Sequence, residues 1–158
     1  MANEIRFKLN GSEIVYTGNP SMRLVEYLRG EKQLTGTKIG CKQGECGACS
    51  VIMDSELVNS CLVAMGRVNG AEVTTIEGYS KTEKFAALDK AFESVSAVQC
   101  GFCIPGMVLA SESLLASNPH PTEEEIREGI SGNLCRCTGY NSIVKAIEIA
   151  AEEGSGLW

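Results

Sequence analysis

The chain has 158 residues, of which 44% are hydrophobic, and a formal net charge of −6. This length suits one ordinary domain or two small ones, and the apolar content excludes an intrinsically disordered chain. No basic patch favours nucleic acid, and the sequence indicates neither a membrane-spanning apolar run nor a signal peptide. We therefore expect a cytoplasmic protein with no membrane span and no nucleic-acid partner.

The first half is predicted to form a small sheet crossed by one helix. Apolar and charged residues alternate over 5–9, Asn10-Gly11 suits a tight turn, and a second extended run follows at 14–16, so this segment is predicted to be a β-hairpin. The other predicted elements are a short helix over 24–30 and strands over 50–53 and 72–76. This order favours a β-grasp domain.

A cysteine-rich loop, GCKQGECGAC at 40–49, lies between the predicted helix and the next strand. The spacing C-x4-C-x2-C is the plant-type arrangement for a [2Fe-2S] cluster, whose fourth thiolate comes from farther along the chain. The predicted ligands are Cys41, Cys46, Cys49 and Cys61. A structural zinc site is the main alternative; zinc ribbons pair two C-x-x-C motifs instead. Disulfides are disfavoured in a reducing cytosol.

From about residue 81 the apolar residues recur every three or four positions, which predicts helices. Thr122 and Glu125 form a plausible capping box for the third of them. The expected linker is the segment 77–80, so that the domains span 1–78 and 79–158. The four helices are centred on the apolar residues of 85–95, 107–115, 126–130 and 143–151.

The helical half carries a second cysteine set in two loops, QCGFC and NLCRC. A C-x-x-C and a C-x-C can surround one site if their loops meet at the ends of neighbouring helices. Glycine and proline flank both loops, so backbone N–H groups outside the helices can point at the sulfur atoms. We expect a second [2Fe-2S] cluster, with zinc again as the alternative. Its predicted ligands are Cys100, Cys103, Cys135 and Cys137.

In this order, GCKQGECGAC, QCGFCIPGM and SGNLCRCTGY closely resemble the small iron–sulfur subunit of the xanthine dehydrogenase family, the molybdenum hydroxylases. The resemblance implies an α+β chain, in which an N-terminal ferredoxin-like domain precedes a C-terminal four-helix-bundle domain and each holds one [2Fe-2S] cluster. It also implies that Gln99 and Cys137 contact the molybdopterin of a large catalytic subunit. Ile104 replaces a threonine that is common in this family.

By this resemblance, the chain relays electrons from molybdenum through both clusters to FAD on a flavin-binding subunit or to an external acceptor, and itself holds no catalytic residue. The complex would be a hetero-oligomer, for which a dimer of heterotrimers is one arrangement. Its substrate would be an N-heteroaromatic compound such as xanthine or nicotinate. The alternatives are a free-standing two-cluster electron carrier and a zinc-stabilised interaction module. The apolar C-terminal tail leaves two alternatives: a frayed end, or an anchor in which Trp158 binds a partner subunit.

Overall fold

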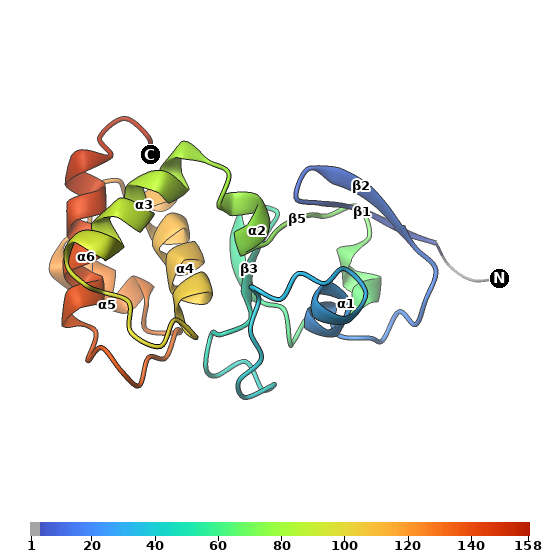
Figure 1. The fold of residues 1–158 in the computed structure, drawn as a ribbon. Helices are drawn as coiled ribbons and strands as arrows, with labels where there is room; N and C mark the ends of the chain where they lie inside the picture. Colours follow the sequence, from blue (N-terminus) through green and yellow to red (C-terminus); the bar gives the residue numbers. More distant parts are fainter. Residues whose placement is uncertain (1–3) are drawn as a thin grey trace.

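The computed structural model describes residues 4–158 and has a mixed α+β architecture, with a sheet in the first half and helices in the second (Figure 1). One five-stranded sheet has the order β2-β1-β5-β3-β4. Its strands are β1 Ile5–Leu9, β2 Ser12–Tyr16, β3 Ser50–Met53, β4 Glu56–Asn59 and β5 Glu72–Thr74. The helices are α1 Leu24–Gly30, η1 Met65–Val68, α2 Ile76–Tyr79, α3 Glu83–Ser94, α4 Ile104–Ser117, α5 Glu123–Gly129 and α6 Asn141–Glu153.

The predicted hairpin is confirmed, because β1 and β2 pair as antiparallel neighbours. Asn10 and Gly11 have φ angles of 50° and 80°, the left-handed values that a two-residue hairpin turn of type I′ requires. Alternate side chains of β1 are buried and pack against α1, where Leu24, Tyr27 and Leu28 are also buried. The sheet and α1 therefore share one core, as the alternating pattern predicts.

The prediction for the last strand was too long. β5 ends at Thr74, where it pairs in parallel with β1 and antiparallel with β3, and Ile76 already begins α2. Two further elements were not predicted from the sequence, namely β4, which pairs with β3, and η1. Strand β4 forms an edge of the sheet and contacts α4, whereas η1 contacts β1 and packs in the core of the sheet half.

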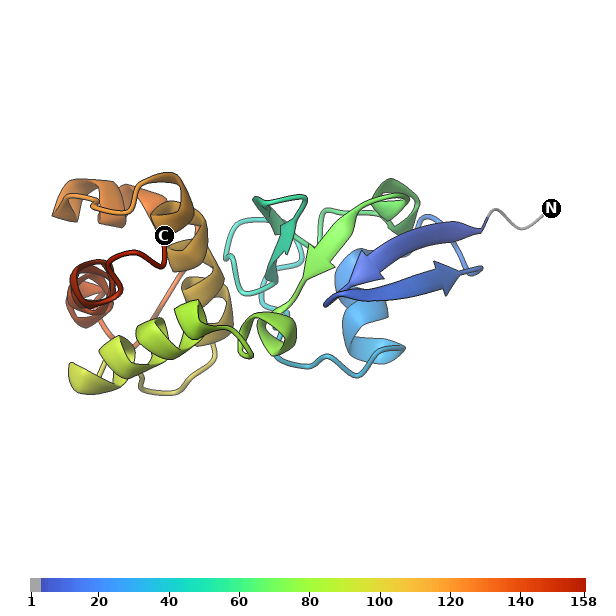
Figure 2. The same cartoon turned by 90° about the horizontal axis from the view of Figure 1, so that it is seen from above.

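The four predicted helices of the second half are confirmed as α3 to α6, and the capping box of Thr122 and Glu125 is present at the start of α5. Helix α4 lies between the other helices and the sheet, where it contacts β3 and β4 (Figure 2). This central position explains why α4 is apolar on most of its surface, with seven buried residues. None of the helices within residues 4–158 is long and apolar enough to cross a membrane.

The segment expected to be a linker is packed instead. Residues 76–79 form α2, and Tyr79 is buried in the helical core, where its hydroxyl donates a hydrogen bond of 2.7 Å to Glu112 in α4. Burial and the nearby Glu112 carboxylate raise the pKa of Tyr79, so the hydroxyl remains a donor. The segment that connects the two halves is thus a packed helical turn held to α4 by a hydrogen bond.

The C-terminal tail also packs on its own chain, which contradicts a frayed end; the anchoring of Trp158 on a partner stays a prediction. The half-buried indole donates a hydrogen bond of 2.7 Å from Nε1 to Glu112 and lies against Gly154. Lys84 lies 5.9 Å from the ring centroid and forms a 3.0 Å ion pair with Glu112. Glu112 thereby joins α2, α3 and the tail to α4.

Candidate iron–sulfur centres

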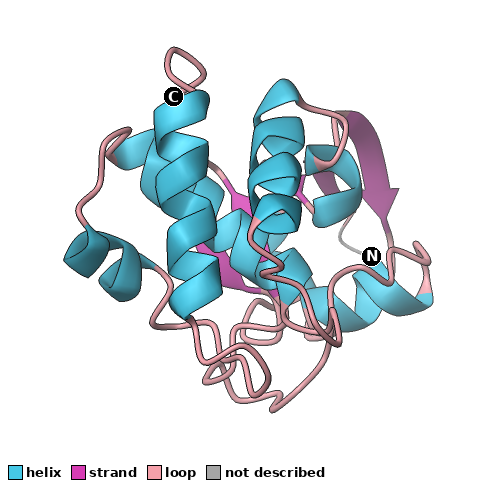
Figure 3. Cartoon of the chain, turned by 60° about the vertical axis from the view of Figure 1, so that its left-hand side comes forward, coloured by secondary structure: helices cyan, strands magenta, loops and turns pink. Residues whose placement is uncertain are grey.

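The sequence colours of Figure 1 place the cysteine loops 40–49, 95–103 and 131–140 along the lower side of the molecule, and Figure 3 shows loops gathered below the helices. The first loop, 40–49, connects α1 to β3. The loops of the second set precede α4 and α6. The two sets are in direct contact there, because the backbone N–H of Leu134 donates a 3.0 Å hydrogen bond to the carbonyl of Cys46.

Within the first set, Cys41 and Cys46 form one half-buried pair. The Cys41 sulfur accepts backbone hydrogen bonds from Gln43 at 3.3 Å and Glu45 at 3.4 Å, and the Cys46 sulfur accepts one from the N–H of Cys41 at 3.4 Å. Because these donors stabilise the thiolate, they lower the pKa of Cys41 to about 6. This part of the loop favours a negatively charged sulfur.

Cys49 and Cys61 form the other pair of the first set, and both are buried. Burial, reinforced by the Cys61 thiol, raises the pKa of Cys49 to about 11. Asn59 lies beside this pair, with Oδ1 3.9 Å from the Cys49 sulfur, and its Nδ2 donates to the carbonyl of Gly44 at 2.9 Å. The Cys49 thiol thus remains protonated at neutral pH, whereas a bound metal would take it as a thiolate.

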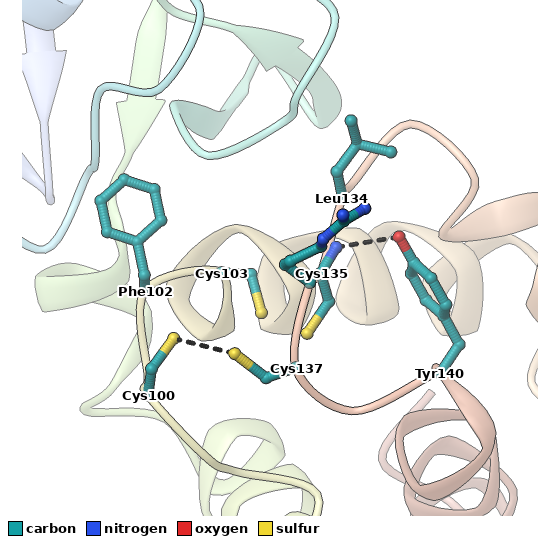
Figure 4. A pocket seen from close by; sticks show the side chains of 8 residues that line it. Cys100, Phe102, Cys103, Leu134, Cys135, Cys137 and Tyr140 are labelled. Atoms are coloured by element: carbon teal, nitrogen blue, oxygen red, sulfur yellow. Dashed lines mark hydrogen bonds between the residues drawn. The ribbon is translucent and has the colours of Figure 1, made fainter.

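The second set converges on one space, shown in Figure 4, where the four sulfur atoms point toward one another. The sulfurs of Cys100 and Cys137 are 3.6 Å apart and both residues are exposed. Cys103 is buried, and Cys135 is half-buried beside it. This contact and burial raise the pKa of Cys103 to about 12, burial being the larger cause.

Hydrogen bonds lower the pKa of Cys135, as expected for this set. Burial acts in the opposite direction, but the Thr138 hydroxyl at 3.1 Å and backbone N–H groups of Cys137 and Thr138 outweigh it and lower the pKa to about 7. The Tyr140 hydroxyl accepts a 2.9 Å hydrogen bond from the backbone N–H of Cys135 and so holds the loop in place. N–H donors to sulfur occur in the first set as well, where they were not predicted from the sequence.

The thiols of each set interact in two pairs. Among residues 4–158, no three Cys, His, Asp or Glu side chains are placed to hold a single metal ion. A dinuclear iron centre takes two thiolates on each iron, which fits such pairs. The pairs are Cys41 with Cys46, Cys49 with Cys61, Cys100 with Cys137, and Cys103 with Cys135.

Comparison with known proteins agrees with two such centres. Residues 7–74 match the model of a 2Fe-2S iron–sulfur cluster binding domain, and residues 75–148 match that of a [2Fe-2S] binding domain. The chain is 43% identical to the nicotinate dehydrogenase small FeS subunit of Eubacterium barkeri over 94% of both chains. It belongs to the iron–sulfur small subunits of the xanthine dehydrogenase family.

Two further relatives support this membership. The iron–sulfur subunit is 41% identical to a probable xanthine dehydrogenase component of Bacillus subtilis, over 90% of this chain and 82% of the relative. The crystal structure of quinoline 2-oxidoreductase from Pseudomonas putida 86 matches with a TM-score of 0.88 and 45% identity, over 95% of this chain and 94% of that one. The subunit is thus an electron-transfer component of an oxidoreductase.

The exposed face of the second set gathers polar and apolar groups that the iron–sulfur subunit leaves open. Gln99 is exposed directly before Cys100. Phe102 and Leu134 are 47% and 55% exposed and line a recess with the four cysteines of this set. Contact with apolar side chains of a second protein chain would remove the Phe102 and Leu134 side chains from water.

Several residues that shape the sites were not predicted from the sequence. Thr138 and Tyr140 directly follow the last cysteine in the CRCTGY motif, so their positions were visible in the sequence although their hydrogen bonds to Cys135 were not. Asn59 reaches the buried cysteine pair only because it ends β4, a strand that was itself not predicted.

Proposed function

We propose that this chain carries single electrons between a molybdenum centre on a large catalytic subunit and FAD on a flavin-binding subunit. The arrangement of its eight thiols as two sets of paired sulfurs, in loops that touch each other, carries this proposal. The first [2Fe-2S] cluster would be held by Cys41, Cys46, Cys49 and Cys61, and the second by Cys100, Cys103, Cys135 and Cys137. When bound, each cluster supplies one-electron oxidation and reduction.

The chain itself would tune these centres. Backbone N–H groups of Gln43 and Glu45 and the hydroxyl of Thr138 donate to sulfur atoms. Such donors stabilise added negative charge and raise the reduction potential. No nucleophile or general base is needed for electron relay, and substrate oxidation belongs to the partner.

The two halves of the fold provide one domain for each cluster. We assign residues 1–78 to a β-grasp, ferredoxin-like domain and 79–158 to a four-helix-bundle domain, because Tyr79 is the first residue buried in the helical core. Eight free cysteines suit a reducing compartment, so we assign the protein to the cytoplasm.

The exposed second set would face the large subunit, with Gln99 and Cys137 in contact with its molybdopterin. An amide side chain offers both a donor and an acceptor to such a polar heterocycle. The first set would then face the flavin-binding subunit in a hetero-oligomer, with a dimer of heterotrimers as one arrangement. An N-heteroaromatic substrate such as xanthine or nicotinate is supported by the names of the relatives above.

The test is low-temperature electron paramagnetic resonance of the dithionite-reduced complex, purified through a tag on this chain, together with iron, zinc and molybdenum analysis. The proposal expects two distinct [2Fe-2S] signals, about four irons per chain, and molybdenum in the same fraction. Two signals without any copurifying molybdenum subunit would indicate a free-standing carrier instead. Zinc in place of iron would exclude electron relay altogether.

A further inference from the structure

Asn133 belongs to the loop of the second cysteine set but uses its side chain on the first. The residue is 3% exposed, and its Nδ2 donates to the Gly47 carbonyl at 3.0 Å and to the Ser50 hydroxyl at 3.2 Å. A side-chain amide has two N–H donors, so both are satisfied by the first loop and its strand. The Ser50 hydroxyl also donates to Gly47 at 2.7 Å, which ties the same carbonyl a second time.

The backbone continues this contact toward the metal sites. The N–H of Leu134, which directly follows Asn133, donates to the carbonyl of Cys46, which directly precedes Gly47. Leu134 is in turn covalently joined to Cys135. This hydrogen bond therefore joins Cys46 of the first set to Leu134, the residue before Cys135 of the second set. Asn133 is the residue before Leu134.

The backbone segments around Gly47 are packed too closely to admit a side chain there. A Cβ atom at Gly47, where φ is +67°, would lie 2.4 Å from the Gly132 carbonyl oxygen. A Cβ atom at Gly106 would lie 2.5 Å from the Gly47 carbonyl oxygen and 3.0 Å from the Asn133 amide. Three segments thus meet around Gly47 at the closest approach that main chains allow, with the Asn133 amide among them.

We propose that Asn133 is a positioning residue that fixes the separation of the two cysteine sets and thereby the rate of electron transfer between them. This inference rests on the proposed function. The step moves one electron from the centre at the second set to the centre at the first, so the first is reduced as the second is oxidised, and no bond is made or broken. Asn133 touches neither set of sulfur atoms; it acts through the loop that carries Cys46.

The test replaces Asn133 with aspartate, which keeps the shape but removes both donors and sets a carboxylate against the Gly47 carbonyl. Ser50→Ala is the milder variant, since it removes one acceptor of Asn133 from within the sheet and leaves the amide in place. Each is studied in the complex purified through a tag on this chain. Two quantities are measured: the spin–spin splitting between the two reduced centres, and the rate of electron equilibration between them after a pulse from a photochemical one-electron reductant.

Electron transfer between two centres slows as the distance between them grows, so we expect equilibration severalfold slower in Asn133→Asp and a smaller slowing in Ser50→Ala. The splitting should decrease in the same order, while iron content stays at the wild-type value. Asn10→Asp is the matched control. The Asn10 amide likewise joins distant segments, because it donates one hydrogen bond to the Thr75 hydroxyl and accepts one from the Thr75 backbone N–H, and its replacement should leave both quantities unchanged.

If a variant has both centres loaded and keeps the wild-type spin–spin splitting and equilibration rate, the role of Asn133 is overturned. A lower unfolding temperature in that variant would not rescue it, because a merely structural role predicts a lower unfolding temperature and nothing else. If Asn133→Asp does not assemble, Ser50→Ala decides by the same two measurements. The proposed function fails separately, and is recognised by a wild-type complex that lacks two [2Fe-2S] signals.

Discussion

Gly40 is a position in the first cysteine loop where a side chain would meet a ligand sulfur. An added Cβ atom there would lie 2.8 Å from the Cys46 sulfur, closer than real Cβ contacts come. The glycine at this position therefore serves the sulfur next to it and not a turn, since its φ is not among the left-handed values of the loop.

Gly40→Ala should displace the Cys46 sulfur and reduce occupancy of the first centre severalfold, while the second centre is retained. Iron analysis and paramagnetic resonance of the reduced protein measure this outcome. Gly30→Ala is the matched control, because nothing lies within 4 Å of an added Cβ atom at Gly30. Full iron content in Gly40→Ala would contradict the crowding seen at Cys46.

The thiol of Cys41 offers a test by pH in the metal-free chain. Backbone donors lower its pKa to about 6, against about 8.5 for an ordinary cysteine. The thiolate is the reactive form, so alkylation of Cys41 should reach half of its maximal rate near pH 6 and slow as the pH falls below that value. The buried thiol of Cys49, with a pKa of about 11, should stay unreactive at neutral pH. Mass spectrometry of the labelled peptides follows both; equal rates at pH 7 would refute the difference.

At the scale of elements, the sequence predicted what periodicity can encode. The β1–β2 hairpin, α1 and the four long helices follow from alternating or three-and-four spacing, and the eight candidate ligands follow from cysteine spacing alone. Strand β4 was missed because its turn uses Asp54 and Ser55 at φ angles of 51° and 71°, where a glycine would have been the usual signal. The four-residue α2 is too short for a period, and the bond from Asn133 to Gly47 spans 86 positions, so only tertiary packing brings it about.

The packing of the tail on α4 makes a prediction at this scale. Trp158→Ala removes the contact between Lys84 and the indole ring and the indole hydrogen bond to Glu112. This should lower the free energy of unfolding by about 1–3 kcal/mol, a smaller loss than the replacement of a fully buried tryptophan causes. Denaturant unfolding followed by circular dichroism measures the change. Because the chain has a single tryptophan, fluorescence of the wild type reports the tail directly. An unchanged midpoint in the variant would mean that the tail does not pack.

For the whole molecule, two separate ligand sets imply two centres that can be lost one at a time. Cys137→Ser should damage the second centre and reduce electron flow from substrate to the proposed flavin at least about 100-fold, because the exposed Cys137 pairs with Cys100 at the face that we propose contacts the large subunit. The signal of the first centre should persist under dithionite. Reduced-state paramagnetic resonance and rapid-mixing absorbance of the flavin measure the two effects. Loss of both signals together would show that the sets depend on each other.

The distribution of ligands along the chain also bears on how the protein is made. The first set is complete once residue 61 has been synthesised, within the sheet half, whereas the second needs loops on both sides of α4 and α5. Chains emerge from the ribosome with the N-terminal part first, at about 5–20 residues per second. All four cysteines of the first set therefore emerge before the last two cysteines of the second set. Loading in that order would give the growing helical half a preformed loop against which Asn133 can close.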